Sequence, residues 1–277
     1  MTTEHFRSLV YKIMYLAQVT NPIIAWSTQQ AAKHVEAIDE THVKWLKNLV
    51  SYIVNNKDIL LTYNRVANPF FHAIGDSTWA ECKTTRKSTG GYFVFYGACC
   101  IEWKSSKHDF NATSSNHAEY YEQNQAAHAA ISYQNFFQQL DQSGGHYSKL
   151  VEVTPIFGDN KGAIAQALDP SNYKGTKHFE LNLHDQRGMI ANKKIALFYI
   201  PTGDNLADML AKQPAKPKFL RDSKIVLGLA HLDFSQYMFD IHKKKLQSID
   251  DLISIAQDFR REQALLSKKA RAIRGNL

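Results

Sequence analysis

The order of strand-forming and helix-forming segments between residues 70 and 212 most constrains how this chain can fold. Short runs rich in aromatic and β-branched residues occur at 70–75, 92–96 and 101–103, with glycine-containing turns between them. Residues 115–140 contain no Gly or Pro and predict one long helix. Strand and helix segments then alternate to residue 212. This order predicts a mixed α/β domain of about 140 residues that begins with an antiparallel meander.

The segments on either side of this region are predicted to be helical. Before residue 62, apolar residues recur at the helical period, which is typical of helices that pack through one face. A proline-containing break at 214–217 precedes a C-terminal part with a basic end. We therefore expect a helical segment over 1–66, the α/β domain over 67–215 and a helical, basic extension over 216–277.

Composition narrows the class of protein. Three cysteines without paired spacing exclude a disulfide framework or a zinc knuckle, and no apolar run approaches the roughly 18 residues of a membrane span. The first residues lack the apolar core of a signal peptide, so we expect an intracellular protein, with cytoplasm and nucleus both open. The net charge of +7 favours a polyanionic partner. Nine Lys and Arg residues against four acids in 241–277 carry most of this excess.

Four acidic residues stand where such a fold could carry chemistry. Asp76 and Asp159 each follow an apolar run directly, Glu119 lies early in the long predicted helix, and Asp208 lies in the last short helix, predicted over 205–212. Carboxylates brought together repel one another unless cations neutralise them, and Mg²⁺ prefers such oxygen ligands. Two ions about 3.5–4 Å apart activate water and stabilise the leaving oxygen of a phosphodiester. The acids therefore favour metal-dependent nucleic-acid hydrolysis, while a turn-forming or capping role stays open for each.

The order of short motifs gives a more specific prediction. The N-terminal motifs are Phe6-Arg-Ser-Leu-Val10, Asn21-Pro-Ile-Ile-Ala25 and His42-Val-Lys-Trp-Leu-Lys47. The later motifs are Gly75-Asp-Ser-Thr-Trp-Ala80, Thr85-Arg-Lys-Ser-Thr-Gly-Gly-Tyr92 through Trp103-Lys-Ser-Ser-Lys107, Ser114-Ser-Asn-His-Ala-Glu-Tyr120, Gly158-Asp-Asn-Lys-Gly-Ala-Ile164, Thr176-Lys-His178, Ile200-Pro-Thr202 and Asn205-Leu-Ala-Asp-Met-Leu-Ala-Lys212. Through these motifs, residues 6–62 resemble the segment that follows the polymerase palm in copia-type retrotransposon Pol polyproteins, and residues 70–215 resemble the family's ribonuclease H.

This resemblance implies a fold and an activity. The fold would be a ribonuclease H-like mixed five-stranded sheet with flanking helices, and residues 1–66 would be a remnant of the reverse transcriptase thumb or connection. The activity would be Mg²⁺-dependent cleavage of the RNA strand of an RNA–DNA hybrid, with two ions for which Mn²⁺ can substitute. Asp76, Glu119, Asp159 and Asp208 match the family's metal-binding acids. Asp76 would bridge both ions, Glu119 and Asp159 would complete the coordination, and Asp208 would hold the second ion and the entering water.

Basic residues near the predicted hairpin are candidate nucleic-acid contacts. Arg86, Lys87 and Lys104 could bind backbone phosphates, which dominate nucleic-acid affinity, although solvated surface charge explains them equally well. Selection for RNA would come from 2′-hydroxyl contacts across a wide minor groove. Other parts of the retroelement Pol protein are further expected partners, and the oligomeric state stays open.

Departures from the family pattern keep other functions open. No Tyr-x-Asp-Asp occurs, so we do not expect this chain to copy nucleic acid by itself. Phe179-Glu180 stands where the family has an apolar residue and Asp, and we expect Glu180 to lie on a helix outside the carboxylate cluster. Between Ile200 and Asp208 there is no His of the kind that cellular ribonucleases H carry. The alternative to an active nuclease is a catalytically silent, decayed or repurposed fragment that binds nucleic acid or a partner. A third interpretation, a transposase-like nuclease of related fold, fits the Asn-x-Ala-Asp helix less well.

Overall fold

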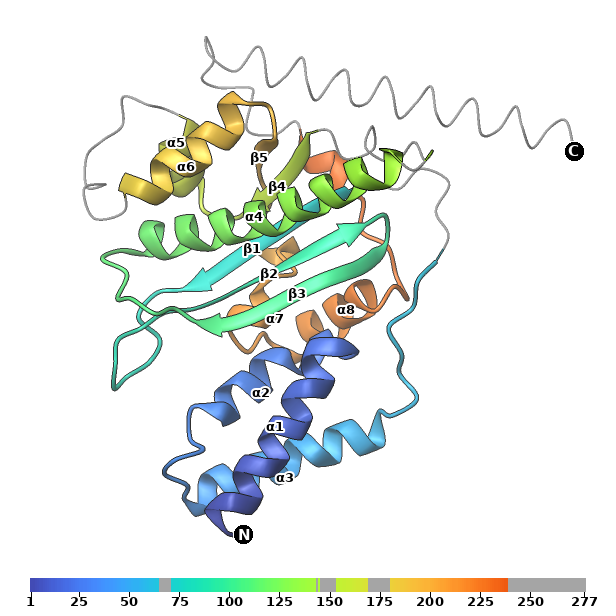
Figure 1. Ribbon diagram of the computed structural model, residues 1–277. Coiled ribbons are helices and arrows are strands. Elements are labelled where there is room, and N and C mark those ends of the chain that lie inside the picture. Colours follow the sequence, from blue (N-terminus) through green and yellow to red (C-terminus); the bar gives the residue numbers. More distant parts are fainter. Residues whose placement is uncertain (65–70, 143, 145–152, 169–179, 239–277) are drawn as a thin grey trace, which may run out of the picture.

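A five-stranded mixed sheet forms the centre of the molecule (Figure 1). The computed structural model describes residues 1–64, 71–142, 144, 153–168 and 180–238. Strands β1 (Phe71–Thr78), β2 (Thr89–Tyr96) and β3 (Cys99–Lys107) pair antiparallel, whereas β4 (Thr154–Gly158) pairs parallel with β1 and β5 (Ile195–Tyr199) parallel with β4. The strand order is β3-β2-β1-β4-β5. The predicted mixed five-stranded sheet with flanking helices is confirmed.

Helices cover both faces of the sheet (Figure 1). One face carries α4 (Ser115–Gln142), α5 (Lys161–Leu168) and α6 (Glu180–Ala191). The other face carries the short helix α7 (Asp208–Ala211), α8 (Lys216–Val226) and the N-terminal helices, which are α1 (Thr3–Val19), α2 (Ala25–Ala32) and α3 (Glu40–Asn55). Short 3-10 helices complete the described elements: η1 (Pro22–Ile24), η3 (Thr202–Asp204) and η4 (Phe234–Met238).

The strand residues alternate between two hydrophobic clusters. Ile74 and Phe93 belong to a cluster with the N-terminal helices, while their neighbours Ala73 and Val94 pack with α4. This alternation follows from the two-residue period of a strand, which sends successive side chains to opposite faces. The two clusters therefore bury both faces of the sheet.

Glycines in β2 let helices approach the sheet closely. A Cβ at Gly90 would overlap the Glu122 side chain of α4, and a Cβ at Gly91 would overlap Leu210 of α7. The two adjacent glycines thus serve opposite faces of the same strand, and both helices that bear candidate site residues depend on them.

The N-terminal helices and the segment after residue 215 share one hydrophobic cluster with the sheet. Phe6 and Val10 of α1 are fully buried in it, and the Trp103 indole nitrogen on β3 donates a 2.6 Å hydrogen bond to the Ala17 carbonyl. Phe234 of η4 lies against the buried His72 of β1, with ring centroids 4.3 Å apart. The domain boundaries expected at residues 66 and 215 stay predictions, and the described parts on either side of them pack together.

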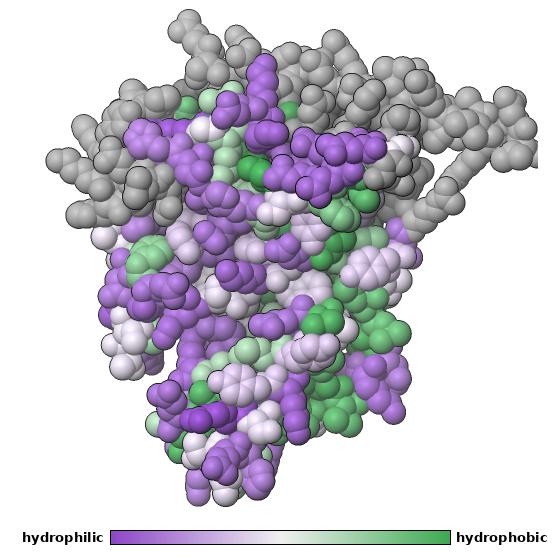
Figure 2. All heavy atoms as spheres, in the orientation of Figure 1, coloured by the Kyte–Doolittle hydropathy of each residue, from purple (hydrophilic) through white to green (hydrophobic). Residues whose placement is uncertain are grey.

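The surface is mixed in character. Figure 2 shows hydrophilic and hydrophobic residues interspersed, with hydrophobic ones gathered on the side where α3 ends. Val54 near the end of α3, and Leu60 and Tyr63 after it, are each about 60% exposed or more. Among the described helices, none combines the length and apolar character needed to cross a membrane.

Candidate active site

Asp76 and Asp159 reach the same place from neighbouring strands. The expectation that Asp76 follows a strand was wrong: Asp76 lies inside β1, opposite Gly91 of β2, because the polar end of β1 keeps its pairing through Thr78. Asp159 comes directly after β4, as expected. Since β1 and β4 are adjacent and parallel, the two aspartates emerge at the same edge of the sheet.

Glu119 in the second turn of α4 completes a three-acid cluster with these aspartates. One carboxylate oxygen from each of Asp76, Glu119 and Asp159 lies within 4.8 Å of the other two. Each aspartate is preceded by a glycine that faces α4: a Cβ at Gly75 would lie 3.3 Å from the Glu122 carbonyl oxygen, and one at Gly158 would overlap the Gln123 amide. The Gly-Asp pairs therefore allow the close approach of α4 that brings Glu119 to the cluster.

Burial makes the charged form of this cluster costly. Desolvation raises the pKa of Asp76 well above its ordinary value; Lys212 opposes this, and Asp208 and Asp159 add to it. Desolvation also raises the pKa of Glu119, and Asp76 and Asp159 raise it further. Asp76 Oδ2 and Glu119 Oε2 are buried and accept no hydrogen bond from the described residues. Buried, unsatisfied carboxylate oxygens within 4.8 Å of one another match the ligands of a hard divalent cation.

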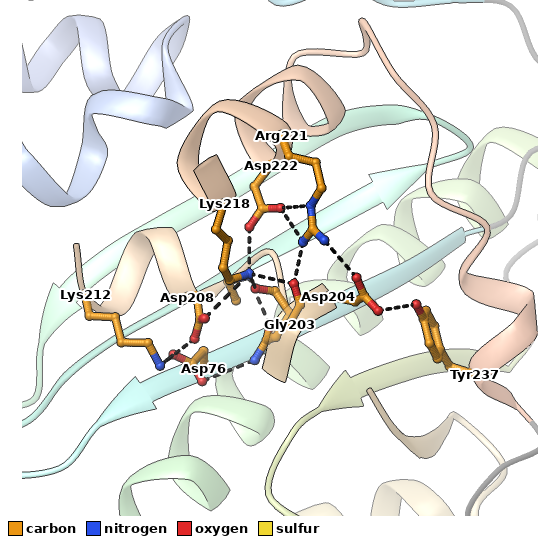
Figure 3. Close-up of polar contacts among 11 residues, drawn as sticks. Asp76, Gly203, Asp204, Asp208, Lys212, Lys218, Arg221, Asp222 and Tyr237 are labelled. Carbon is orange, nitrogen blue, oxygen red and sulfur yellow. Dashed lines mark hydrogen bonds and ion pairs between the residues drawn. The ribbon is translucent and has the colours of Figure 1, made fainter. Parts of the chain in front are cut away.

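Asp208 stands beside the three-acid cluster and is held by lysines. It is buried at the first position of α7, where its Oδ1 lies 2.6 Å from Lys212 Nζ and its Oδ2 lies 3.6 Å from Lys218 Nζ. Lys212 Nζ also lies 3.6 Å from Asp76 Oδ2 (Figure 3). Burial by itself lowers the pKa of Lys212, but the carboxylates of Asp76, Asp208 and Asp159 raise it above its ordinary value. All four predicted acids thus lie in one region, and Asp208 differs from Asp76 in that it contacts two lysines, Lys212 and Lys218.

Asn205 explains why α7 is shorter than the helix predicted over 205–212. Its backbone is extended, and its side-chain oxygen accepts a 3.1 Å hydrogen bond from the Ala207 amide. Its side-chain nitrogen donates a 3.2 Å hydrogen bond to Asp76 Oδ1. The residue therefore ties the loop before Asp208 to the central aspartate of the cluster.

A second polar network anchors this loop to α8 (Figure 3). Lys218 Nζ donates hydrogen bonds to the carbonyls of Gly203 (3.2 Å) and Asn205 (2.9 Å) and to Asp222 Oδ2 (2.7 Å). Arg221 bridges the buried Asp222 and Asp204, whose other oxygen accepts a 2.7 Å hydrogen bond from the Tyr237 hydroxyl. Because α8 supplies both cations, the position of Asp208 depends on residues beyond 215.

Three residues that contribute to the site were not predicted from the sequence as site residues: Asn205, Lys212 and Lys218. Asn205 and Lys212 are part of the motif that carried Asp208, and the i, i+4 spacing of Asp208 and Lys212 on a helix is a signal for an ion pair. Lys218 could not be found in this way because it lies beyond the Pro214 break and reaches the site only through packing of α8.

The three candidate nucleic-acid contacts differ in their exposure and in their hydrogen bonds. Arg86 is exposed in the β1–β2 turn with a positive φ of 55°, and Lys104 is exposed on β3. Lys87 donates a 2.5 Å hydrogen bond to the Asp109 carbonyl, so its ammonium already has a protein partner. Phosphate contact stays a prediction for all three residues.

Some predicted features lie outside the described residues or at their margin. The Thr176-Lys-His178 motif, Phe179 and the basic residues after 238 are outside them. Glu180 lies on a helix, as expected, and is the first described residue of α6.

Comparisons with known proteins agree with the motif order. The chain is 27% identical over 214 residues to a retrovirus-related Pol polyprotein from transposon RE1 of Arabidopsis thaliana, a match that covers 77% of this chain and 14% of the relative. It is 26% identical over 219 residues to the Pol polyprotein from transposon RE2 of the same plant, covering 79% of this chain and 15% of that relative. The chain therefore spans only a small part of the length of these relatives. The resemblance to copia-type Pol polyproteins is confirmed by these homologues.

No family model matches the chain. Among solved structures, RNase H1 from Halobacterium salinarum aligns over 55% of this chain and 98% of its own length, with 16% identity and a TM-score of 0.34.

Proposed function

We propose that this chain is a divalent-metal-dependent ribonuclease H that cuts the RNA strand of an RNA–DNA hybrid. The observation that carries the proposal is the cluster of Asp76, Glu119 and Asp159, whose carboxylate oxygens lie within 4.8 Å of one another in a largely buried setting. The homologous Pol polyproteins support a retrotransposon ribonuclease H, and through them other parts of a Pol protein are proposed partners. Mg²⁺ is the proposed ion, and Mn²⁺ is expected to replace it.

The three acids would hold the ion through their carboxylate oxygens. A bound divalent ion supplies a more acidic water and stabilises negative charge on the phosphodiester oxygens. The chain itself does the positioning: β1 and β4 hold the two aspartates rigidly, and the Asn205 hydrogen bond orients Asp76. Asp208 is proposed to contribute to the same site from α7, held in place by Lys212 and Lys218.

The substrate class is proposed from charge and context. Exposed Arg86 and Lys104 would contact the phosphate backbone of a hybrid, and 2′-hydroxyl groups would distinguish the RNA strand. A hybrid presents both features, whereas double-stranded DNA lacks the 2′-hydroxyl.

The test is cleavage of a hybrid with a fluorescent label on its RNA strand. We expect the purified chain with Mg²⁺ to shorten the RNA strand and to leave a matched DNA duplex intact. Asp76→Asn and Asp159→Asn should each abolish cleavage. Asp58→Asn, which removes an exposed acid outside the three-acid cluster, serves as the matched control and should cut like the wild type. Intact RNA after incubation with folded wild-type protein and either Mg²⁺ or Mn²⁺ would refute the proposal and favour a silent binding fragment.

A further inference from the structure

The Lys212 ammonium lies between two of the acids proposed to bind metal. Its Nζ is 2.6 Å from Asp208 Oδ1 and 3.6 Å from Asp76 Oδ2 (Figure 3). By contrast, among the described residues the cluster of Asp76, Glu119 and Asp159 is the one group of three acids whose oxygens could hold an ion together. The two sides of the site therefore differ: one side presents three carboxylates, and the other presents two carboxylates with a lysine between them.

We propose that Lys212 is the built-in cation of the Asp76–Asp208 side, so that a second divalent ion binds there only in competition with its ammonium group. This inference rests on the proposed metal-dependent function and concerns how many ions the site holds. The first ion would bind at the three-acid cluster, and the second would bind more weakly because it must displace Lys212 from Asp208.

Charge and geometry carry this inference. An ammonium 2.6 Å from Asp208 Oδ1 already neutralises the charge of this carboxylate, so the carboxylate attracts a divalent ion less strongly while the contact is kept. The positive charge of Lys212 also repels a divalent ion that approaches Asp208. Lys218 adds a second positive charge, 3.6 Å from Asp208 Oδ2. Two lysines around one aspartate thus oppose ion binding most strongly beside Asp208.

The displaced side chain has room to move. Lys212 lines a pocket of about 400 Å³ together with Trp26, Trp45 and Phe219, between the N-terminal helices and α8. Its side chain is 41% exposed, whereas those of Asp76 and Asp208 are nearly inaccessible. Movement of the Lys212 ammonium group toward this pocket would break few packing contacts. An ion can therefore displace the ammonium group while the chain stays folded.

The test is a Mn²⁺ titration of the whole chain without substrate, with free Mn²⁺ followed by its electron paramagnetic resonance signal. We expect wild-type protein to bind one ion tightly and a second at least about tenfold more weakly. Lys212→Met should tighten the second ion by about tenfold or more, a larger change than it makes to the first ion, because Lys212 lies closer to Asp208 than to Asp76. The matched control is Lys216→Met, which removes a lysine lining the same pocket and should titrate like the wild type. Thermal melting of each variant establishes that it is folded.

A second comparison isolates the contact with Asp208. In an Asp208→Asn background, Lys212→Met should no longer change the binding of a second ion, because the competition for that carboxylate is gone. Identical isotherms for wild type and Lys212→Met, each with two ions, would overturn the role of Lys212 and leave the proposed nuclease standing. Failure of the folded wild-type chain to bind any Mn²⁺ would overturn both.

Discussion

The side-chain nitrogen of Asn205 donates a 3.2 Å hydrogen bond to Asp76 Oδ1, joining two buried residues that are 129 positions apart in the sequence. Asp76 belongs to the central strand, while Asn205 belongs to the loop that leads into α7. The bond orients the carboxylate of Asp76, which belongs to the three-acid cluster and also lies beside Lys212. It also links the loop to the strand, since the Asn205 oxygen accepts from the Ala207 amide at the same time.

Removal of this side chain should weaken metal binding and stability together. In Asn205→Ala, Asp76 Oδ1 loses its donor and the Ala207 amide loses its acceptor, so we expect a loss of about 1–3 kcal/mol in the free energy of unfolding. Loss of an orienting partner of a metal ligand typically lowers metal affinity by about 10–100-fold. Urea denaturation and Mn²⁺ titration measure the two effects. The exposed Asn192→Ala is the control; equal behaviour of both variants would contradict the positioning role.

Neutralising Glu119 should stabilise the metal-free chain at neutral pH. Burial, Asp76 and Asp159 raise the pKa of this carboxyl above its value in the unfolded chain, which is about 4.3. The folded state therefore keeps its proton where the unfolded state has lost it, and stability contributed by the neutral form falls as pH rises from about 4 through the folded-state pKa.

The Glu119→Gln side chain does not ionise, so folding of this variant carries no cost of keeping a proton on a buried carboxyl at neutral pH. Its free energy of unfolding should therefore exceed that of the wild type at pH 7 by about 1–3 kcal/mol and match it near pH 4. Urea unfolding in EDTA across this pH range measures the difference. Mg²⁺ should raise the melting temperature of the wild type and not that of Glu119→Gln. The exposed Glu36→Gln is the control; a Glu119→Gln curve parallel to the wild type at all pH values would contradict the raised pKa.

The element order of the fold could be predicted from the sequence, because strand-forming runs and a Gly- and Pro-free helix leave strong local signals. The acids could be assigned only through the motif order, since an Asp at a strand end has several ordinary explanations. Two features depend on tertiary contacts that leave little local signal. Asp76 lies inside β1 because the polar residues after it still pair with β2, and α7 begins at Asp208 because the Asn205 side chain caps a turn. The contribution of Lys218 arises entirely from packing of α8.

Two Gly→Ala changes should have opposite effects on stability, because only Gly91 lies where α7 approaches the sheet closely. A Cβ at Gly91 would overlap Leu210 and lie 2.6 Å from the Lys104 carbonyl oxygen, so Gly91→Ala should lower the free energy of unfolding by about 3 kcal/mol. Gly188, inside α6, has nothing within 4 Å of such a Cβ, and Gly188→Ala should stabilise the helix by about 0.5–1 kcal/mol. Thermal denaturation compares them. A Gly91→Ala variant as stable as Gly188→Ala would mean that α7 does not pack against β2 in this way.

Packing of the segment after residue 215 predicts how much of the chain the folded unit needs. Ile225 and Val226 of α8 and Phe234 of η4 are buried in the cluster that contains the sheet, and the Phe234 ring lies 5.5 Å from that of Phe157. A chain ended at residue 215 would expose this cluster and also lose the Lys218 bonds to the loop before Asp208. We therefore expect the 1–215 chain to lose its cooperative thermal transition, whereas a 1–238 chain keeps it.

A point variant tests the same packing without truncation. Phe234→Ala should cost about 3–5 kcal/mol, the usual loss for a buried phenylalanine, and the exposed Leu229→Ala should cost little. Circular dichroism melts of all four proteins compare the outcomes. If the 1–215 chain melted cooperatively at the temperature of the 1–238 chain, residue 215 would be a true domain boundary, and α8 would be dispensable for holding Asp208.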